Sequence, residues 1–179
     1  CNNDNPDFLN IHDCFEVIRG FNYVVSHLEK VKNNKELLGP NVIDNVERGL
    51  KYSMKDITWA HQEQTKIYNN FRKFFENYDV LICPAASVSP FPHEQLFVEE
   101  INNEKLPTYM RWLALSYAPT MAIPCAWALP CGLDHKNLPF GIQLIAPAGN
   151  DAKLSEIALA IEDALSNHEE TKRAIPDIV

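Results

Sequence analysis

The sequence contains little glycine and no long apolar run, and these absences exclude several classes of protein. Only 6 of the 179 residues are glycine, and neither a P-loop nor a G-x-G-x-x-G dinucleotide-binding loop occurs. A G-x-S-x-G nucleophile elbow is also missing. The longest apolar run is far shorter than the roughly 20 residues that cross a bilayer, and no signal-peptide pattern is present. We therefore expect no cofactor and no membrane partner.

The charge balance and the cysteines narrow the class further. The net charge is −8 and the isoelectric point is about 5.2, which argues against a nucleic-acid partner because such proteins usually present a basic face. Five cysteines, an odd number without close pairing, are not typical of a disulfide framework. We expect reduced thiols in a cytoplasmic protein. The polar opening CNNDNPDF lacks an initiator Met, so we expect the native chain to begin before Cys1.

Cysteine and histidine residues could suggest a metal site or a nucleophile. Cys125, Cys131 and His135 have the spacing C-x5-C-x3-H, which is not a familiar zinc pattern, so we predict no metal. A Cys–His pair that uses Cys83 or Cys125 is a weaker hypothesis, because a cysteine beside proline in an apolar run usually serves packing.

Hydrophobic periodicity predicts three helices in the first 75 residues. The first spans Asn10–Val31 and begins at an N-cap asparagine, and a short second helix spans Asn41–Leu50, with Asn41 as its cap. Ser53 and Asp56 have the spacing of a capping box, so the third helix begins there.

The second half of the chain alternates short apolar runs with helical patterns. Predicted strands are Tyr78–Pro84, Ile123–Pro130 and Phe140–Pro147, a proline-rich loop follows the first, and helices start at Pro107 and at Asn150 or Asp151. We predict an α/β fold of about three buried strands packed with four to five helices. We also predict one domain over residues 1–179, with a frayed tail over 167–179. Since a narrow sheet has two bare edges, missing chain or another subunit should cover one.

Three segments carry a resemblance to a known family. FRKFFENYDVLICPAASVSPFP is similar to that family's helix, strand and proline-rich loop, IPCAWALPCGL to its "lPaisvPcGl" segment, and LPFGIQLIAPAGNDAKLSEIALAIED to its last strand and helix. With these segments the chain resembles the amidase-signature hydrolases. The order and spacing of the segments imply the C-terminal half of the amidase-signature fold.

The resemblance implies an enzyme that hydrolyses carboxamide C–N bonds with a Ser–cis-Ser–Lys triad and a serine nucleophile. In the family these residues lie in the N-terminal half, with a Gly/Ser-rich loop that this sequence lacks. We therefore assign no catalytic residue and expect a fragment that is inactive alone. Its implied partners are the missing N-terminal half and a small-molecule amide substrate, and a homo-oligomer stays open. The alternative is a stand-alone, non-catalytic module that binds a ligand or a subunit.

The resemblance also implies that this half shapes the substrate pocket. The candidates are Tyr109, Trp112 and Ser116 on one predicted helix face, Phe91 in the proline-rich loop, and Gln143 in the last strand. Core packing is the alternative for Tyr109 and Trp112, and a structural hydrogen bond is favoured for Gln143. Residues 119–122 read PTMA where the family usually has Asn-x-x-Gly, so the substrate stays open.

Overall fold

The computed structural model describes residues 4–175, and the chain divides into two compact units. The helical unit is Asp7–Asn70, and the sheet unit comprises the chain from Phe71 onward together with the residues up to Pro6. Cys1 and the end of the predicted frayed tail, residues 176–179, lie outside the described residues, so the expectation that the native chain begins before Cys1 stays a prediction. One domain over residues 1–179 stays a prediction.

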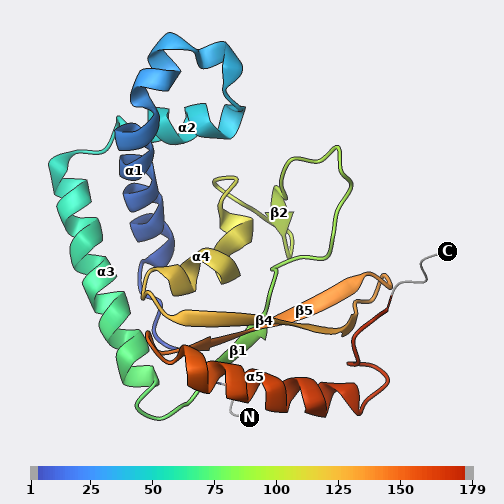
Figure 1. Ribbon diagram of the computed structural model, residues 1–179. Helices are drawn as coiled ribbons and strands as arrows, with labels where there is room; N and C mark the ends of the chain where they lie inside the picture. The colour runs from blue at the N-terminus through green and yellow to red at the C-terminus, as the bar shows by residue number, and fades with distance from the viewer. Residues whose placement is uncertain (1–3, 176–179) are drawn as a thin grey trace. The chain divides into compact units, whose positions relative to one another are not determined.

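The helical unit consists of α1, η1, α2 and the first part of α3 (Figure 1). Their bounds are α1 Ile11–Asn33, η1 Lys35–Leu37, α2 Pro40–Gly49 and α3 Met54–Phe74. The first helix begins directly after Asn10, as predicted, but the Asn10 side chain donates to Glu63 Oε2 at 3.4 Å instead of capping. The prediction of Asn41 as a cap is wrong. Gly39 is the N-cap and Pro40 opens α2, because the fixed φ of proline suits the first helical turn.

The capping box of α3 is confirmed. The Ser53 backbone N–H donates to Asp56 Oδ2 at 2.8 Å, and the Asp56 N–H donates to Ser53 Oγ at 3.3 Å. These reciprocal bonds satisfy donors that the helix leaves unpaired at its N-terminus. Hydrogen bonds from the Ser53 hydroxyl and backbone lower the pKa of the Asp56 carboxyl below its ordinary 3.8.

Ser53→Ala should lower the free energy of unfolding by about 1 kcal/mol at neutral pH, the usual cost of a lost N-cap. Because the pKa of Asp56 is lowered in the folded state, its stabilisation is present above the ordinary pKa and is lost as pH falls through the folded value. Urea unfolding at a series of pH values should therefore show the Ser53→Ala difference shrinking in acid. Ser155→Ala, which removes a hydroxyl bonded to the Asp151 carbonyl, should show no such pH trend.

The sheet unit contains a three-stranded antiparallel sheet of order β1-β5-β4. Its strands are β1 Leu81–Pro84, β4 Cys125–Leu133 and β5 Pro139–Ala146, and a small separate hairpin pairs β2 Glu100–Ile101 with β3 Glu104–Lys105. The helical elements of this unit are η2 Arg111–Leu113, α4 Ala114–Thr120 and α5 Asp151–Ser166. The predicted α/β class with three main strands is confirmed.

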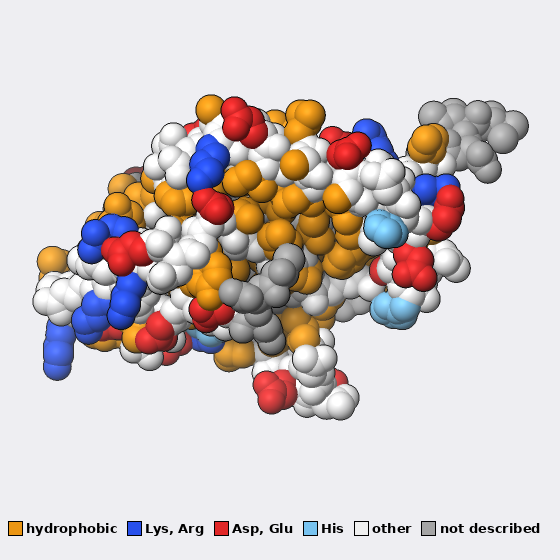
Figure 2. Space-filling view, turned by 90° about the horizontal axis from the view of Figure 1, so that it is seen from below, with side chains coloured by type: hydrophobic (Ala, Val, Ile, Leu, Met, Phe, Trp, Pro, Cys, Tyr) orange, Lys and Arg blue, Asp and Glu red, His pale blue; other side chains and the backbone are white. Residues whose placement is uncertain are grey.

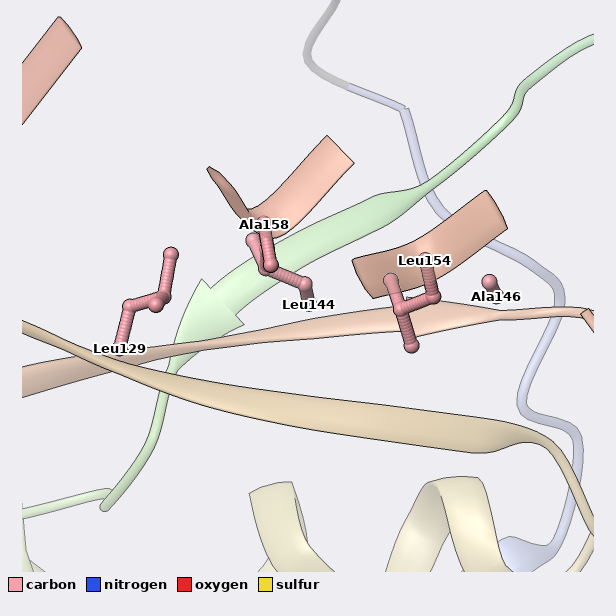
Figure 3. Packing of buried hydrophobic residues seen from close by; sticks show 5 residues of the cluster. All are labelled: Leu129, Leu144, Ala146, Leu154 and Ala158. Carbon is pink, nitrogen blue, oxygen red and sulfur yellow. The ribbon is translucent and has the colours of Figure 1, made fainter. Parts of the chain in front are cut away.

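One face of the sheet packs on α5 and forms a core. Leu154 and Ala158 of α5 lie against Leu129, Leu144 and Ala146 of the strands (Figure 3). This packing follows from the sequence, because i and i+4 share a helix face and alternate strand residues share a sheet face. The opposite face of β5 meets α4 through Gln143. The sheet thus lies between the helices α4 and α5 (Figure 1).

Several element boundaries differ from the predictions; β1, for example, begins at Leu81 and not at Tyr78. The strand predicted to end at Pro130 continues to Leu133, with an irregular register between these residues; proline is tolerated at such irregularities and on edge strands. The helix predicted from Pro107 starts only at Arg111, as the 3-10 turn η2, and α4 then includes Pro119.

The strands are less buried than predicted. Leu144, Ile145 and Ala146 of β5 are buried, whereas Trp127 of the edge strand β4 is 45% exposed. Edge strands have a neighbour on one side only, so their residues gain less cover. Figure 2 shows hydrophobic side chains gathered over the middle of the face seen from below, with charged side chains mostly around them.

Candidate functional site

A pocket of about 480 Å³ lies in the sheet unit between the proline-rich loop after β1 and the turn that joins β4 to β5. It is lined by Pro84, Ala85, Ala86, Ser87, Val88, Ser89, Pro90, Phe91, Trp112, Asp134, His135, Pro139, Phe140 and Gly141. Most of this wall is aromatic or aliphatic, with a few polar groups, which is the usual make-up of a small-molecule site.

Two of the predicted site residues meet in this pocket. The rings of Phe91 and Trp112 make an edge-to-face contact, with centroids 5.4 Å apart and planes at 81°. Such a pair is a favourable arrangement of aromatic rings. It joins the proline-rich loop to η2, two segments about 20 residues apart in the sequence, and so fixes one wall of the pocket. Their contact with a substrate stays a prediction.

Tyr109 and Ser116 do not line this pocket. The Tyr109 ring lies 6.0 Å from the ring of Phe97, and Ser116 is an exposed residue of α4. The predicted single helix face does not form, because Tyr109 precedes η2 and the chain changes from 3-10 to α geometry before Ser116. Their roles as substrate contacts stay predictions.

Gln143 makes two hydrogen bonds to backbone. Its Nε2 donates to the Leu115 carbonyl at 2.7 Å and to the Pro84 carbonyl at 3.2 Å. Leu115 lies four residues before Pro119, whose nitrogen has no hydrogen to donate to it. The amide of Gln143 thus takes the place of the missing helical donor, and it explains how α4 tolerates an internal proline. This contact is the structural alternative favoured for Gln143 from the sequence.

Asp134 is a pocket residue that the sequence analysis missed. Its Oδ1 accepts the backbone N–H groups of Lys136 at 2.8 Å and Leu138 at 3.0 Å, and this side-chain turn shapes the β4–β5 connection. A hydrogen bond from the Ser89 hydroxyl and those from the backbone lower the pKa of the Asp134 carboxyl. The sequence DHKN is a signal for such a turn, but a turn motif does not reveal which loop lies beside it.

Two polar atoms of the pocket wall have no hydrogen-bond partner among the described residues. They are Ser87 Oγ and Asp134 Oδ2, and both are buried. Native proteins pair nearly all such atoms, so these two distinguish the pocket from the rest of the sheet unit.

Cys83 and Cys125, the two cysteines considered as nucleophiles, are in positions that do not favour that role. Cys125 Sγ donates to the Pro147 carbonyl at 3.2 Å, and burial raises the pKa of the Cys83 thiol, which disfavours the thiolate that a nucleophile needs. Between residues 4 and 175, no group of three or more His, Cys, Asp or Glu side chains is arranged to hold a metal ion. No helix described here is long and apolar enough to cross a membrane.

Comparison with known sequences gives a family match over most of the chain. The family model named Amidase matches residues 16–154. A glutamyl-tRNA(Gln) amidotransferase subunit of Streptomyces avermitilis is 34% identical over 106 residues, which is 59% of this chain and 20% of the relative. Its counterpart in Clostridium acetobutylicum is 34% identical over 100 residues, 54% of this chain and 19% of that protein. The chain therefore spans about a fifth of the length of these relatives.

Solved structures share the fold at low sequence identity. A protein of a vestigial complex that reveals the evolutionary origins of an s-triazine catabolic enzyme aligns with a TM-score of 0.81 and 19% identity, over 95% of this chain and 36% of that one. 6-Aminohexanoate cyclic dimer hydrolase aligns with a TM-score of 0.71 and 18% identity, over 92% of this chain and 37% of the other. At this identity the likeness establishes the fold alone.

Proposed function

The chain belongs to the amidase family, and we propose that it forms the C-terminal, pocket-bearing part of an amidase that hydrolyses carboxamide C–N bonds other than peptide bonds. The observation that carries this proposal is the pocket walled by Phe91 and Trp112. The family resemblance points to these two residues, and they lie together in a cavity of a size that suits a small molecule.

The catalytic triad lies outside this chain in the proposal. The sequence has no Gly/Ser-rich segment to supply an oxyanion hole, and the chain matches about a fifth of the length of its relatives. Phe91 and Trp112 then provide apolar contact to the substrate, while Gln143 holds α4 in place beside β5. The serine nucleophile comes from the N-terminal half, and the fragment alone is inactive.

A bare sheet edge supports a macromolecular partner for this unit. In the order β1-β5-β4, both β1 and β4 pair on one side only within the described residues. Unpaired strand edges are normally covered in native proteins. The N-terminal half of the same enzyme is the proposed cover, and a different protein or a second copy of this chain is the alternative.

The first experiment measures the mass of the native product, by immunoblot of source cells with an antibody raised against this segment. A band well above 20.4 kDa, large enough to contain a catalytic half, is expected. The long form should then release ammonia or amine from small amides, whereas the 179-residue chain should not. A band at 20.4 kDa would contradict the fragment and favour a stand-alone module that binds a ligand or a partner protein.

In the long form, Trp112→Ala should raise KM for a small amide about tenfold and change kcat much less. The indole contributes apolar contact of about 1.4 kcal/mol, and such contact binds substrate and transition state alike, so its loss appears in KM. Trp127→Ala is the matched control, because Trp127 is an exposed tryptophan of β4 outside the pocket. If the two changes raised KM equally, the pocket walled by Phe91 and Trp112 would not be the substrate site.

A further inference from the structure

We propose that the pocket selects its ligand by charge: it takes neutral and, preferentially, cationic amides with an aryl or alkyl body, and it disfavours anionic amides. The inference rests on the proposed function, because it names the substrate class of the same pocket. Its basis is the uneven chemistry of the pocket wall.

The charged groups of the wall are unbalanced. Asp134 contributes a carboxylate, and His135 is the other titratable residue of the lining. No Lys or Arg side chain lines the pocket within the described residues, so no fixed positive charge offsets Asp134. An anionic ligand would meet repulsion without a counter-charge, and burying such a group unpaired is costly.

Asp134 is held in its ionised form. Hydrogen bonds from the Ser89 hydroxyl and from the backbone N–H groups of Leu138 and Lys136 lower the pKa of the carboxyl. Because Oδ2 is closed to solvent, the carboxylate acts on a ligand through its field rather than by direct contact. Beside an apolar wall that field is screened less than in bulk water.

The aromatic wall adds a second reason for the same preference. Phe91, Trp112 and Phe140 line the pocket, which suits a flat or aliphatic ligand body. The face of an indole also attracts cations through its quadrupole. A cation over the face of one of these rings would therefore be favoured by the aromatic wall as well as by Asp134.

Basic side chains occur on the other side of the β4–β5 turn. Lys172 and Arg173 line an adjoining open cavity of about 970 Å³, together with Glu169 and Glu170, and this cavity shares Asp134, His135 and Phe140 with the pocket. Lys172 pairs with Glu169 at 2.6 Å. These cations are accompanied by equal negative charge, so they do not reverse the sign of the neighbouring pocket.

The test is a series of three amides on one ring that differ only in charge: para-(aminomethyl)benzamide, para-methylbenzamide and para-carbamoylbenzoate. Binding to the long form is followed by tryptophan fluorescence. Trp59, Trp127 and any tryptophan outside these 179 residues are replaced by phenylalanine, so that Trp112 is the reporter and binding elsewhere stays silent. The cation is expected to bind about tenfold more tightly than the anion, with the neutral compound between them.

Asp134→Asn separates charge from structure. Asparagine Oδ1 can still accept both backbone N–H groups, so the turn is kept. The cation-to-anion ratio should fall to about twofold or less, and the affinity for para-methylbenzamide should change less than the affinity for either charged compound. Asp163→Asn removes the same charge from the exposed side of α5 and should leave the ratio as it is.

Each outcome decides the inference. Tightest binding of the anion, or a ratio that Asp134→Asn leaves unchanged, would overturn charge selection while the pocket remains a binding site. No response of Trp112 to any of the three compounds would overturn the aryl or alkyl amide class itself. Neither result touches the proposed amide hydrolysis, which is tested separately by the mass and activity of the long form.

Discussion

Leu154→Ala is expected to lower the free energy of unfolding by about 3 kcal/mol, within the range measured for buried leucines. Leu154 is 1% exposed and packs against Leu129, Leu144 and Ala146, where α5 covers the sheet. Truncation removes apolar contact and leaves a cavity that the strands cannot close, because their backbones are fixed by the hydrogen bonds of the sheet. Urea unfolding followed by circular dichroism measures the change.

Leu159→Ala provides the matched control on the same helix. Leu159 is 70% exposed, so the same deletion of side-chain atoms should change stability by about 0.5 kcal/mol or less. A similar loss of stability in both variants would mean that α5 does not pack on the sheet through Leu154. The core would then have to lie elsewhere in the sheet unit.

The core of the sheet unit was predictable because it rests on local periodicity. Leu154 and Ala158 repeat at helical spacing, and the apolar run of β5 has strand character, so both elements are visible before their contact is known. The extent of β4 and the place of Pro119 were not predictable, since each depends on a partner far along the chain. Pro119 stays in α4 because Gln143, 24 residues later, donates to the carbonyl that the proline leaves free.

The site was predictable in part, from the family resemblance. The family resemblance points to Phe91 and Trp112, which meet in the pocket. It also points to Tyr109 and Ser116 if the helix is one straight element, and the switch from η2 to α4 removes that shared face. Asp134 was missed because its importance arises from Ser89, which lies 45 residues earlier. Charge inside a pocket is a tertiary property that sequence spacing does not encode.

Gly49→Ala is expected to destabilise the helical unit by about 3 kcal/mol, at the upper end of the usual cost of overpacking. A Cβ at this position would lie 2.2 Å from the Gly20 carbonyl oxygen and 2.6 Å from its carbon. Both are backbone atoms, so no side chain can rotate away, and α2 must move off α1. The sign of the change in stability distinguishes this close contact from an ordinary helix position, because Gly→Ala within a helix otherwise stabilises by up to about 1 kcal/mol.

Gly20 and Gly39 give a graded series for this test. At Gly20 a Cβ would meet Tyr52 Cε2 at 2.9 Å and Gly49 Cα at 3.1 Å, so Gly20→Ala should cost less than Gly49→Ala. A Cβ at Gly39 meets nothing within 4 Å, and Gly39→Ala should cost under about 1 kcal/mol, the effect of a poorer N-cap. The order Gly49, Gly20, Gly39 in urea unfolding supports direct contact between the backbones of α1 and α2. Stabilisation by Gly49→Ala would show that the two helices separate in solution. The helical unit would then have to be held together by other packing contacts.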